Sequence, residues 1–334
     1  MNKVLVIYTG GTIGMQPTDR GYAPAGNMLE LINQKIPAAS LSDLPQFELL
    51  EYQTLIDSSN IQPENWAQIA TDISKNYAQY DGFVVLHGTD TMAYTASMLS
   101  FMLQGLSKPV IVTGSQIPLC RSRTDAVENI VGALTLAAND QIAEVCLYFN
   151  GRVLRGNRAR KLNAWHMDAF DSPNFGWLGR LDIKLQLNAT LLKASDKPQF
   201  DLTCQPEPLA MLLPLFPGIS PQWILKAADM PAKAIILHTY GAGNGPESSE
   251  FLAALKSLTD QGKLIVNLTQ CLKGAVVQDS YAAGTALAEV GVISGGDMTP
   301  EAAFCKLHFL FSQGLTREQV IEMMRTNLVG EISL

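Results

Sequence analysis

Short, continuous apolar runs recur along the chain and alternate with stretches of helical periodicity. The clearest runs are Val4–Tyr8, Phe83–His87, Val110–Thr113, Val145–Phe149, Ala234–His238 and Leu264–Leu268. A run that is apolar at every position, rather than at every second one, is typical of a strand buried on both faces of a parallel sheet. The sequence therefore predicts an α/β fold with a mostly parallel, flavodoxin-like sheet, helices on both faces and right-handed crossovers.

The segments between the expected strands carry helix signals. After Pro63, five apolar residues have the i, i+3, i+4, i+7 spacing of one helix face: Trp66, Ile69, Ala70, Ile73 and Tyr77. Further apolar faces are Thr95, Met98, Leu99 and Met102; Val127, Ile130, Val131 and Leu134; and Phe251, Leu252, Leu255 and Leu258. Helix starts are predicted at the Asp-x-x-Glu pattern from Asp125, at Thr299-Pro300-Glu301 and at the capping box Thr316 to Gln319.

Proline becomes frequent in the stretch from about residue 188 to residue 221. It holds Pro198, Pro206, Pro208, Pro214, Pro217 and Pro221. Such density, with little helical periodicity, is typical of a linker or an irregular crossing between domains. A chain of 334 residues is also long for a single core. We therefore expect a larger N-terminal α/β domain at 1–189, a linker at 190–211 and a smaller C-terminal α/β domain at 212–334.

The net charge argues against a nucleic-acid-binding protein, and the lengths of the apolar runs argue against a membrane protein. The formal net charge is −7, whereas binding to nucleic acid requires clustered Lys and Arg. The one basic run, Arg152–Lys161, is short and typical of a solvated loop. No apolar run approaches the roughly 18 residues of a membrane-spanning helix. Only Val4–Tyr8 precedes the first glycines, which is too short for a secretory signal, so we expect a cytosolic protein that binds neither nucleic acid nor membrane.

The cysteines show no metal-ligand spacing. They are Cys120, Cys146, Cys204, Cys271 and Cys305. Their number is odd, and neither a Cys-x-x-Cys pair nor a His at ligand spacing accompanies them. They fit reduced thiols in a reducing compartment, and we expect no metal site.

The segment Thr9–Gly14 directly follows the first expected strand. In open parallel sheets, ligands bind beyond the carboxyl ends of the strands. Glycines let the backbone turn sharply and approach a ligand closely, and Thr12 places a hydroxyl among them. The segment lacks both the Gly-x-Gly-x-x-Gly register and the Lys-Ser/Thr of a P-loop. Taken alone, it fits nucleotide binding and a nucleophile site about equally.

The segment His87–Thr91 also directly follows an expected strand. A Thr or Asp at such a corner is a normal N-cap for the next helix. Two hydroxyls and a carboxylate within three residues exceed what a cap requires, which favours a functional site. Two other candidates have ordinary readings by themselves: Asp57–Asn60 fits a turn and cap, and Lys161 fits a solvated loop.

A nucleophilic threonine needs help, because its hydroxyl holds its proton far above neutral pH. A lysine that is oriented by an aspartate and touches a second hydroxyl can act as a proton relay. Thr89, Asp90 and Lys161 form such a relay if they converge. The backbone amides of the glycine segment, or those of Gly88 and Thr89, are candidate donors to an oxyanion.

These segments resemble a known family. Thr9–Gly14 and His87–Thr91 look like the two signature segments of bacterial L-asparaginases and related glutaminases. The resemblance extends over the whole chain, through Asp57-Ser58-Ser59, Gly151-Arg152-Val153, Ala169–Asn174 and Tyr240–Asn244. Each signature is moderately specific alone, whereas both together, each after a strand, are strongly specific.

The resemblance implies hydrolysis of the side-chain amide of L-asparagine, without metal or cofactor. Thr12 corresponds to the threonine that the substrate acylates, and Tyr22 to the tyrosine on the mobile flap beside it, at Gly14–Gly26. Thr89, Asp90 and Lys161 match the second catalytic group. The α-amino and α-carboxylate groups of the substrate correspond to Asp57, Ser58, Ser59 and Asp90.

The resemblance also implies partners and regulation. Family members act as dimers or dimers of dimers, in which a loop of the neighbouring subunit approaches the site; Asn244 is the candidate here. The N-terminus is similar to that of the cytosolic type I branch, some members of which bind asparagine at a second, regulatory pocket between subunits. Cys271 matches one position of that pocket, whereas His238 stands where an arginine is expected. Loss of a guanidinium weakens the grip on a carboxylate.

Two other functions stay open from the sequence. The amide could belong to glutamine or to a larger molecule such as misacylated tRNA, as in archaeal amidotransferase relatives, although the acidic charge counts against tRNA. The chain could also be a two-domain binding protein for an amino acid or nucleotide, without turnover. Binding alone, however, does not require two threonines, an aspartate and a lysine.

Overall fold

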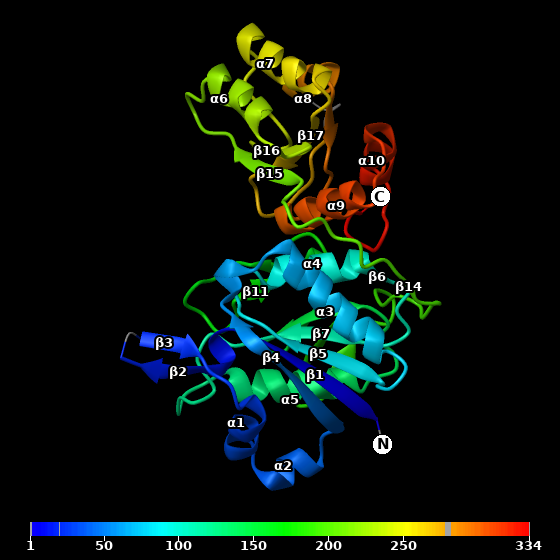
Figure 1. Cartoon of the computed structure of the whole chain (residues 1–334). Helices are drawn as coiled ribbons and strands as arrows, with labels where there is room; N and C mark the ends of the chain where they lie inside the picture. Colours follow the sequence, from blue (N-terminus) through cyan, green and yellow to red (C-terminus); the bar gives the residue numbers. More distant parts are fainter. Residues whose placement is uncertain (1, 20, 278–281, 334) are drawn as a thin grey trace. The chain divides into compact units, whose positions relative to one another are not determined.

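The chain folds into two compact units, Met1–Leu202 and Thr203–Leu334 (Figure 1). The computed structural model describes residues 2–19, 21–277 and 282–333. Each unit has its own sheet and its own apolar core. The α/β class, with a large, mostly parallel sheet and a second, smaller parallel sheet, confirms the prediction from the apolar runs.

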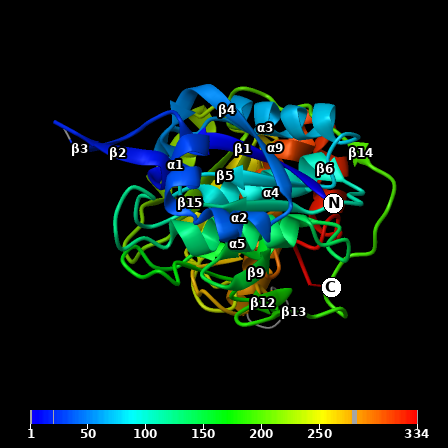
Figure 2. The same ribbon diagram turned by 90° about the horizontal axis from the view of Figure 1, so that it is seen from below.

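The N-terminal unit is built on an eight-stranded sheet in the order β13-β12-β9-β8-β7-β5-β1-β4. Its strands are β1 (Lys3–Gly10), β4 (Gln46–Ile56), β5 (Gly82–Leu86), β7 (Val110–Thr113), β8 (Val145–Phe149), β9 (Arg152–Arg155), β12 (Gly179–Leu181) and β13 (Leu185–Leu187). From β4 to β8 the strands pair in parallel, and β9, β12 and β13 extend one edge antiparallel (Figure 2). All four apolar runs predicted in this unit are central strands, because both of their faces are covered.

Helices cover both faces of this sheet. Figure 1 shows α3 (Pro63–Asn76) and α4 (Met92–Met102) over one face, and α1 (Met28–Lys35) and α5 (Ala126–Ala137) over the other. As the spacing predicted, α3 buries Trp66, Ile69, Ala70 and Ile73. The smaller elements of the unit are η1 (Thr12–Gly14), β2 (Met15–Thr18), β3 (Gly21–Pro24), α2 (Ala38–Ser42), η2 (Ser58–Asn60), β6 (Leu103–Gln104), η3 (Gly156–Arg158), β10 (Arg160–Lys161), β11 (Phe170–Asp171) and β14 (Gln199–Phe200).

The predicted capping role of Asp125 is wrong. The helix α5 does begin after Asp125, but the carboxylate accepts no hydrogen bond from a backbone N–H of the first turn; its one bond from that turn comes from the side-chain amide of Asn129 at 3.3 Å. Its two oxygens instead accept from the backbone N–H groups of Gln116 and Ile117, both at 2.9 Å. The carboxylate therefore ties the turn after β7 to the start of α5. The predicted face is confirmed, since Ile130 and Leu134 are buried in the core of the unit and the half-buried Val127 and Val131 pack against the same core.

The C-terminal unit is a four-stranded parallel sheet in the order β15-β16-β17-β18. Its elements are β15 (Ala210–Pro214), α6 (Pro221–Lys226), η4 (Ala227–Asp229), β16 (Ala234–Thr239), α7 (Ser249–Asp260), β17 (Leu264–Thr269), α8 (Ala282–Glu289), β18 (Val292–Ser294), α9 (Pro300–Ser312) and α10 (Arg317–Met324). The predicted starts of α9 and α10 are confirmed, including the reciprocal capping box of Thr316 and Gln319. The proline-rich stretch contains two strands that the sequence did not indicate, β14 and β15, and β15 tolerates Pro214 because it lies at an edge of its sheet.

All five cysteines are free thiols, as predicted. Within the described part of the chain, none of the helices combines the length and the apolar character that crossing a bilayer demands.

Candidate active site

Four loops meet at the carboxyl ends of the parallel strands β1, β4, β5 and β7. Neighbouring parallel strands end at the same edge of a sheet, so the loops that follow them are brought together. The loop after β1 carries Thr12, the loop after β4 carries Asp57–Asn60 and the loop after β5 carries His87–Thr91. The sequence-predicted segments of the N-terminal unit therefore lie at one end of the sheet.

The glycine segment touches two of the other loops through its backbone. The N–H of Gly11 donates to the carbonyl of Ile56 at 3.0 Å. Gly11 has a φ of +85°, and a Cβ at this position would lie 2.3 Å from the backbone nitrogen of Gly88. No other residue type fits there without moving the backbone. The glycines thus serve close contact between the loops, which is a different use from the phosphate-binding turn that the sequence left open.

Thr12 is the first residue of η1 and is half-buried. Its hydroxyl makes no hydrogen bond to any residue in the described ranges. The turn is anchored on its far side, because the carbonyl of Ile13 accepts from the N–H of Leu119 at 3.0 Å. A fixed backbone with a hydroxyl that is not engaged leaves Thr12 available to an incoming group.

Ser58 joins the loop after β4 to the loop after β5. Its hydroxyl accepts from the backbone N–H of Asp90 at 3.3 Å, and its carbonyl accepts from the Thr91 hydroxyl at 2.7 Å. Thr91 is at the N-cap position of α4, but its side chain caps no helix N–H. The ordinary reading of this corner as a simple helix cap is therefore wrong. In the same loop, the Asp57 carboxylate accepts from both the N–H and the hydroxyl of Ser59, each at 3.0 Å.

Lys161 lies against the loop after β5 and is not a freely solvated lysine. Its ammonium donates to the Thr89 hydroxyl at 2.8 Å and to Oδ1 of Asp90 at 2.7 Å. The Lys161 side chain is only 20% exposed, whereas that of Asp90 is 63% exposed. The three residues that the sequence grouped as a relay are thus in direct contact, with the carboxylate open to solvent.

Arg152 holds the two-stranded ribbon that carries Lys161. Lys161 pairs with Phe170 in that ribbon, formed by β10 and β11. The Arg152 guanidinium donates to the carbonyl of Phe170 at 3.0 Å, and it lies 3.6 Å from the carboxylate of Asp171 and over the ring of Trp177. These contacts fix the strand that positions the lysine, a role that the sequence analysis did not assign.

Behind the site, His87 is part of a buried chain of hydrogen bonds. Burial lowers the pKa of His87 to about 4, so the ring is neutral near pH 7. Its Nδ1 lies 2.7 Å from the carbonyl of Gly88, and its Nε2 lies 3.0 Å from the Thr95 hydroxyl. That hydroxyl also accepts from the indole N–H of Trp66 at 3.0 Å. A neutral ring that donates from Nδ1 and accepts at Nε2 satisfies this chain and fixes the peptide before Thr89.

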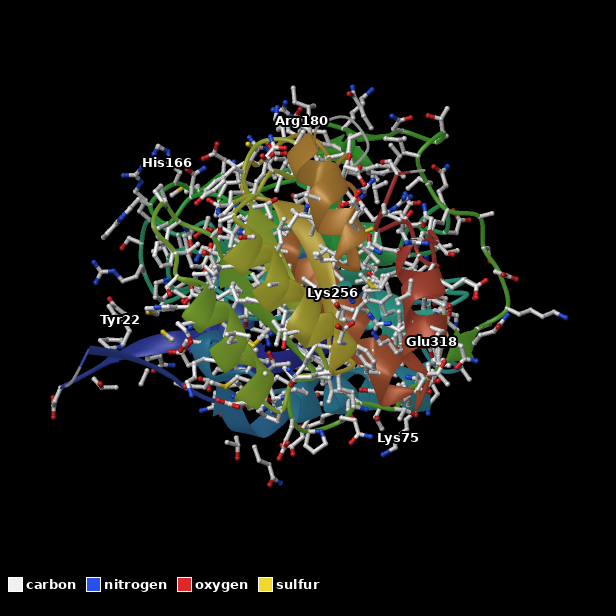
Figure 3. All side chains as sticks on the ribbon, turned by 90° about the horizontal axis from the view of Figure 1, so that it is seen from above. Tyr22, Lys75, His166, Arg180, Lys256 and Glu318 are labelled. Carbon is white, nitrogen blue, oxygen red and sulfur yellow. The ribbon has the colours of Figure 1, made fainter. Side chains whose placement is uncertain are left out.

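Tyr22 lies on the hairpin of β2 and β3, which projects from the body of the N-terminal unit (Figures 1 and 2). Its side chain is 44% exposed and stands off the hairpin in Figure 3. At the base of the hairpin, the N–H of Ala25 donates to the carbonyl of Gly14, and the carbonyl of Ala25 accepts from the Tyr8 hydroxyl. The hairpin is therefore tied down at its base, with Tyr22 farther along it.

Gln116, in the turn after β7, is a site residue that the sequence analysis missed. Its side-chain oxygen lies 3.3 Å from the Thr89 hydroxyl. Nothing in the sequence pattern singles it out, since one glutamine after an apolar run is ordinary. The only available signal is its position at the carboxyl end of a parallel strand.

Three remaining candidates, Asn244, His238 and Cys271, lie in the C-terminal unit. Asn244 forms an isolated bridge with Tyr240. His238 is a half-buried residue of β16, and the thiol of Cys271 is exposed.

Comparisons with known proteins show the family of the chain. The family model for the N-terminal domain of asparaginase matches residues 3–193, and that for the glutaminase/asparaginase C-terminal domain matches residues 211–324. L-asparaginase 1 of Escherichia coli K12 is 46% identical over 332 residues, which cover 99% of this chain and 98% of the relative.

Solved structures give the same result. L-asparaginase I from Vibrio cholerae is 46% identical, with a TM-score of 0.91 and coverage of 100% of this chain and 99% of that one. A probable cytoplasmic L-asparaginase from Campylobacter jejuni is 26% identical, with a TM-score of 0.82 and coverage of 98% and 100%. The chain, matched along nearly its whole length in sequence and in fold, belongs to the asparaginase family.

Proposed function

We propose that this chain hydrolyses L-asparagine to L-aspartate and ammonia, with the Thr12 hydroxyl as the nucleophile. The observation that carries this assignment is the contact of the Lys161 ammonium with both Thr89 and Asp90. Thr89 and Asp90 are in the loop whose Gly88 lies against the glycine segment before Thr12. A binding protein without turnover needs no hydroxyl, carboxylate and ammonium in mutual contact beside an unengaged second hydroxyl.

In the first half of the reaction, the Thr12 oxygen attacks the carboxamide carbon of the substrate. The Lys161 ammonium gives up one proton to the leaving nitrogen as the C–N bond breaks. The proton of the Thr12 hydroxyl passes to the Thr89 oxygen, and the proton of the Thr89 hydroxyl passes to Nζ of Lys161, which is an ammonium again at the end of the step. Ammonia leaves, and the aspartyl group stays esterified to Thr12. Backbone N–H groups of the glycine segment or of Thr89 stabilise the negative charge on the carbonyl oxygen.

In the second half, water attacks the ester carbonyl. The same relay accepts a proton from the water and returns one to the Thr12 oxygen as the ester bond breaks. Aspartate is released and the hydroxyl is restored, so that atoms and charges balance without a cofactor.

The substrate is held by groups that surround this centre. The Asp90 carboxylate is mostly exposed and accepts only one contact from Lys161, so it has capacity to bind an α-ammonium group. We assign the rest of the α-amino and α-carboxylate recognition to Asp57, Ser58 and Ser59. Tyr22, on the hairpin, completes the flap over the nucleophile.

We further propose a cytoplasmic homodimer or dimer of dimers. The likeness to the probable cytoplasmic enzyme of Campylobacter jejuni supports the location. Asn244 is proposed to reach the site of a neighbouring subunit. A second asparagine pocket that includes Cys271 would be weakened by His238, because a histidine is a poorer carboxylate ligand than a guanidinium.

The Thr12→Val variant tests the nucleophile. It keeps the volume of the side chain and removes only the hydroxyl, so we expect ammonia release from asparagine to fall by at least about 10³-fold. Aspartate should still stabilise the variant in thermal unfolding, because the binding groups are intact. The control is Thr12→Ser, which retains a hydroxyl and should retain measurable turnover. Near-normal turnover by Thr12→Val would show that another group attacks the substrate.

A further inference from the structure

Gln116 contacts the catalytic cluster and the loop after Lys161 with opposite ends of one side chain. Its Oε1 accepts from the Thr89 hydroxyl at 3.3 Å. Its Nε2 donates to the backbone carbonyls of His166 at 3.0 Å and Ala164 at 3.2 Å, and the carbonyl of Asn163 lies 3.5 Å away. One amide thus bridges Thr89 to the segment that follows Lys161 along the chain.

The orientation of this amide is determined by its surroundings. Backbone carbonyls only accept hydrogen bonds, so the end of Gln116 that faces residues 163–166 must be the NH₂ group. The opposite end, which faces Thr89, must then be the carbonyl oxygen. Flipping the amide would place an acceptor against three other acceptors.

This orientation sets the direction of the Thr89 O–H bond. The Lys161 ammonium can only donate, so the Thr89 oxygen accepts from it at 2.8 Å. The hydroxyl hydrogen must point to a different acceptor, and Gln116 Oε1 is in range. At 3.3 Å this bond is longer than the usual O–H···O distance of about 2.7–2.8 Å, so the hydrogen is directed without being held tightly.

The position of Gln116 itself does not depend on the loop that it binds. Its backbone N–H donates to Asp125 at 2.9 Å, as does that of Ile117. Asn129 adds a bond from its amide to the carbonyl of Gly114 at 2.9 Å. The turn is therefore fixed from α5, and Gln116 acts as a rigid reference for both of its contacts.

We propose that Gln116 is a positioning residue for the amidohydrolase reaction. While Lys161 is an ammonium, Gln116 directs the Thr89 hydroxyl hydrogen away from it, so that the remaining lone pair of Thr89 faces the proton donor. Because the bond to Gln116 is long, this hydrogen can turn to Nζ of Lys161 once the ammonium has given up a proton. Gln116 also holds the loop that begins at Lys161. This inference rests on the proposed roles of Thr89 and Lys161 as the proton relay.

The first test replaces Gln116 by methionine, which has a similar shape and makes neither contact. For Gln116→Met we expect kcat for asparagine to fall about tenfold or more, with KM changed by less than about threefold, because proton transfer and not substrate binding is impaired. The matched control is Gln141→Met, at an exposed glutamine in the loop before β8; it should leave both constants unchanged. A kcat within about twofold of the original chain, or a loss confined to KM, would overturn the proposal.

The second test is Gln116→Glu, for which the pH dependence of kcat reports on the contacts with Thr89 and with the loop carbonyls. When protonated, the introduced carboxyl group can donate to the loop carbonyls and accept from Thr89. When ionised, it would face the carbonyl of His166, which lies 3.0 Å from the amide nitrogen of the original side chain. We expect the kcat of Gln116→Glu, relative to that of the original chain, to rise as the pH falls from about 8 to about 5. A ratio that does not change with pH, as expected for Gln141→Glu, would contradict the proposed double contact.

A double-mutant cycle separates action through Thr89 from a general effect on the fold. Thr89→Ser keeps the hydroxyl but loses the methyl group that restricts its rotation, so orientation should depend more strongly on Gln116. We expect the kcat losses of Thr89→Ser and Gln116→Met to be non-additive by a factor of about 5; strictly additive losses would overturn the proposal. If Thr12→Val stays active, the proposed function fails; if it is inactive while Gln116→Met is normal, only this inference fails.

Discussion

The contacts of Lys161 favour a role in proton transfer over a role in stability. Lys161 bridges Thr89 and Asp90, yet Asp90 is 63% exposed. An ion pair with so open a partner contributes only about 0–1 kcal/mol to the free energy of unfolding. The contact is therefore too weak a stabiliser to explain why the chain holds this lysine in place on a separate two-stranded ribbon, and a role in proton transfer accounts for it better.

We predict that Lys161→Met lowers kcat for asparagine by about 10²- to 10⁴-fold, the range for losing a general acid–base group. The free energy of unfolding should change by less than about 1 kcal/mol. Lys161→Arg should also be nearly inactive, because a guanidinium keeps its charge but does not release its proton. Lys184→Met, at an exposed lysine, serves as the control. Steady-state kinetics and urea unfolding give the two quantities, and an active Lys161→Arg variant would argue against the relay.

At the scale of elements, the site depends on how closely two loops approach. Gly11 has a φ of +85° and leaves no space for a Cβ beside Gly88. Gly218, in the loop before α6, has the same φ of +85° but nothing within 4 Å of an added Cβ. The pair separates the cost of a left-handed backbone from the cost of forcing two loops apart.

We predict that Gly218→Ala lowers the free energy of unfolding by about 1–2 kcal/mol, the usual cost of this backbone conformation with a side chain, and leaves kcat/KM unchanged. Gly11→Ala should cost more than that and reduce kcat/KM by about 10²-fold, because a shift of about 1 Å in the loop displaces the adjacent Thr12. Urea unfolding and asparagine kinetics on both variants check this. Equal effects of the two substitutions would mean that contact between the loops has no importance for the site.

The sequence predicts those elements whose causes are local. The four central strands of the N-terminal unit and the starts of α9 and α10 follow from apolar runs and capping residues. Asp125 was misassigned because its partners, Gln116 and Ile117, lie outside the helix that it precedes. β15 was missed because edge position, which permits Pro214, is not visible in a one-dimensional pattern.

The candidate site divides in the same way. Thr12, Thr89 and Asp90 stand directly after apolar strands, so their gathering at one end of the sheet follows from parallel pairing alone. Lys161 was grouped with them only on the condition that they converge, from the proton relay that a nucleophilic threonine needs, and the resemblance then supported the grouping; a lysine in a basic run has no local signal. Gln116 was missed because its amide is satisfied by carbonyls about 50 residues later in the chain. Contacts between residues so far apart in the chain depend on the fold, and the spacing of residues within a short segment does not predict them.

At the scale of the whole molecule, each unit buries one histidine in its neutral form. Burial lowers the pKa of His87 in the N-terminal unit, and of His308 in the C-terminal unit, to about 4 in both cases. An unfolded histidine has a pKa of about 6.5. Between these two values the unfolded chain binds more protons than the folded chain, so the stability of each unit must fall as the pH falls.

We predict that the free energy of unfolding decreases by up to about 1.4 kcal/mol per pH unit for each buried histidine as the pH falls from about 6 to about 4.5. His308→Gln keeps a polar side chain but cannot take up a proton, so it should flatten this dependence. His166→Gln is the control, because the His166 side chain is 74% exposed and this substitution removes an imidazole from the surface and not from the interior. Urea unfolding at a series of pH values gives the slopes. If His308→Gln and the original chain lose stability equally steeply below about pH 6, protonation of His308 is not what destabilises the molecule in acid, and its burial is compensated when the ring is charged.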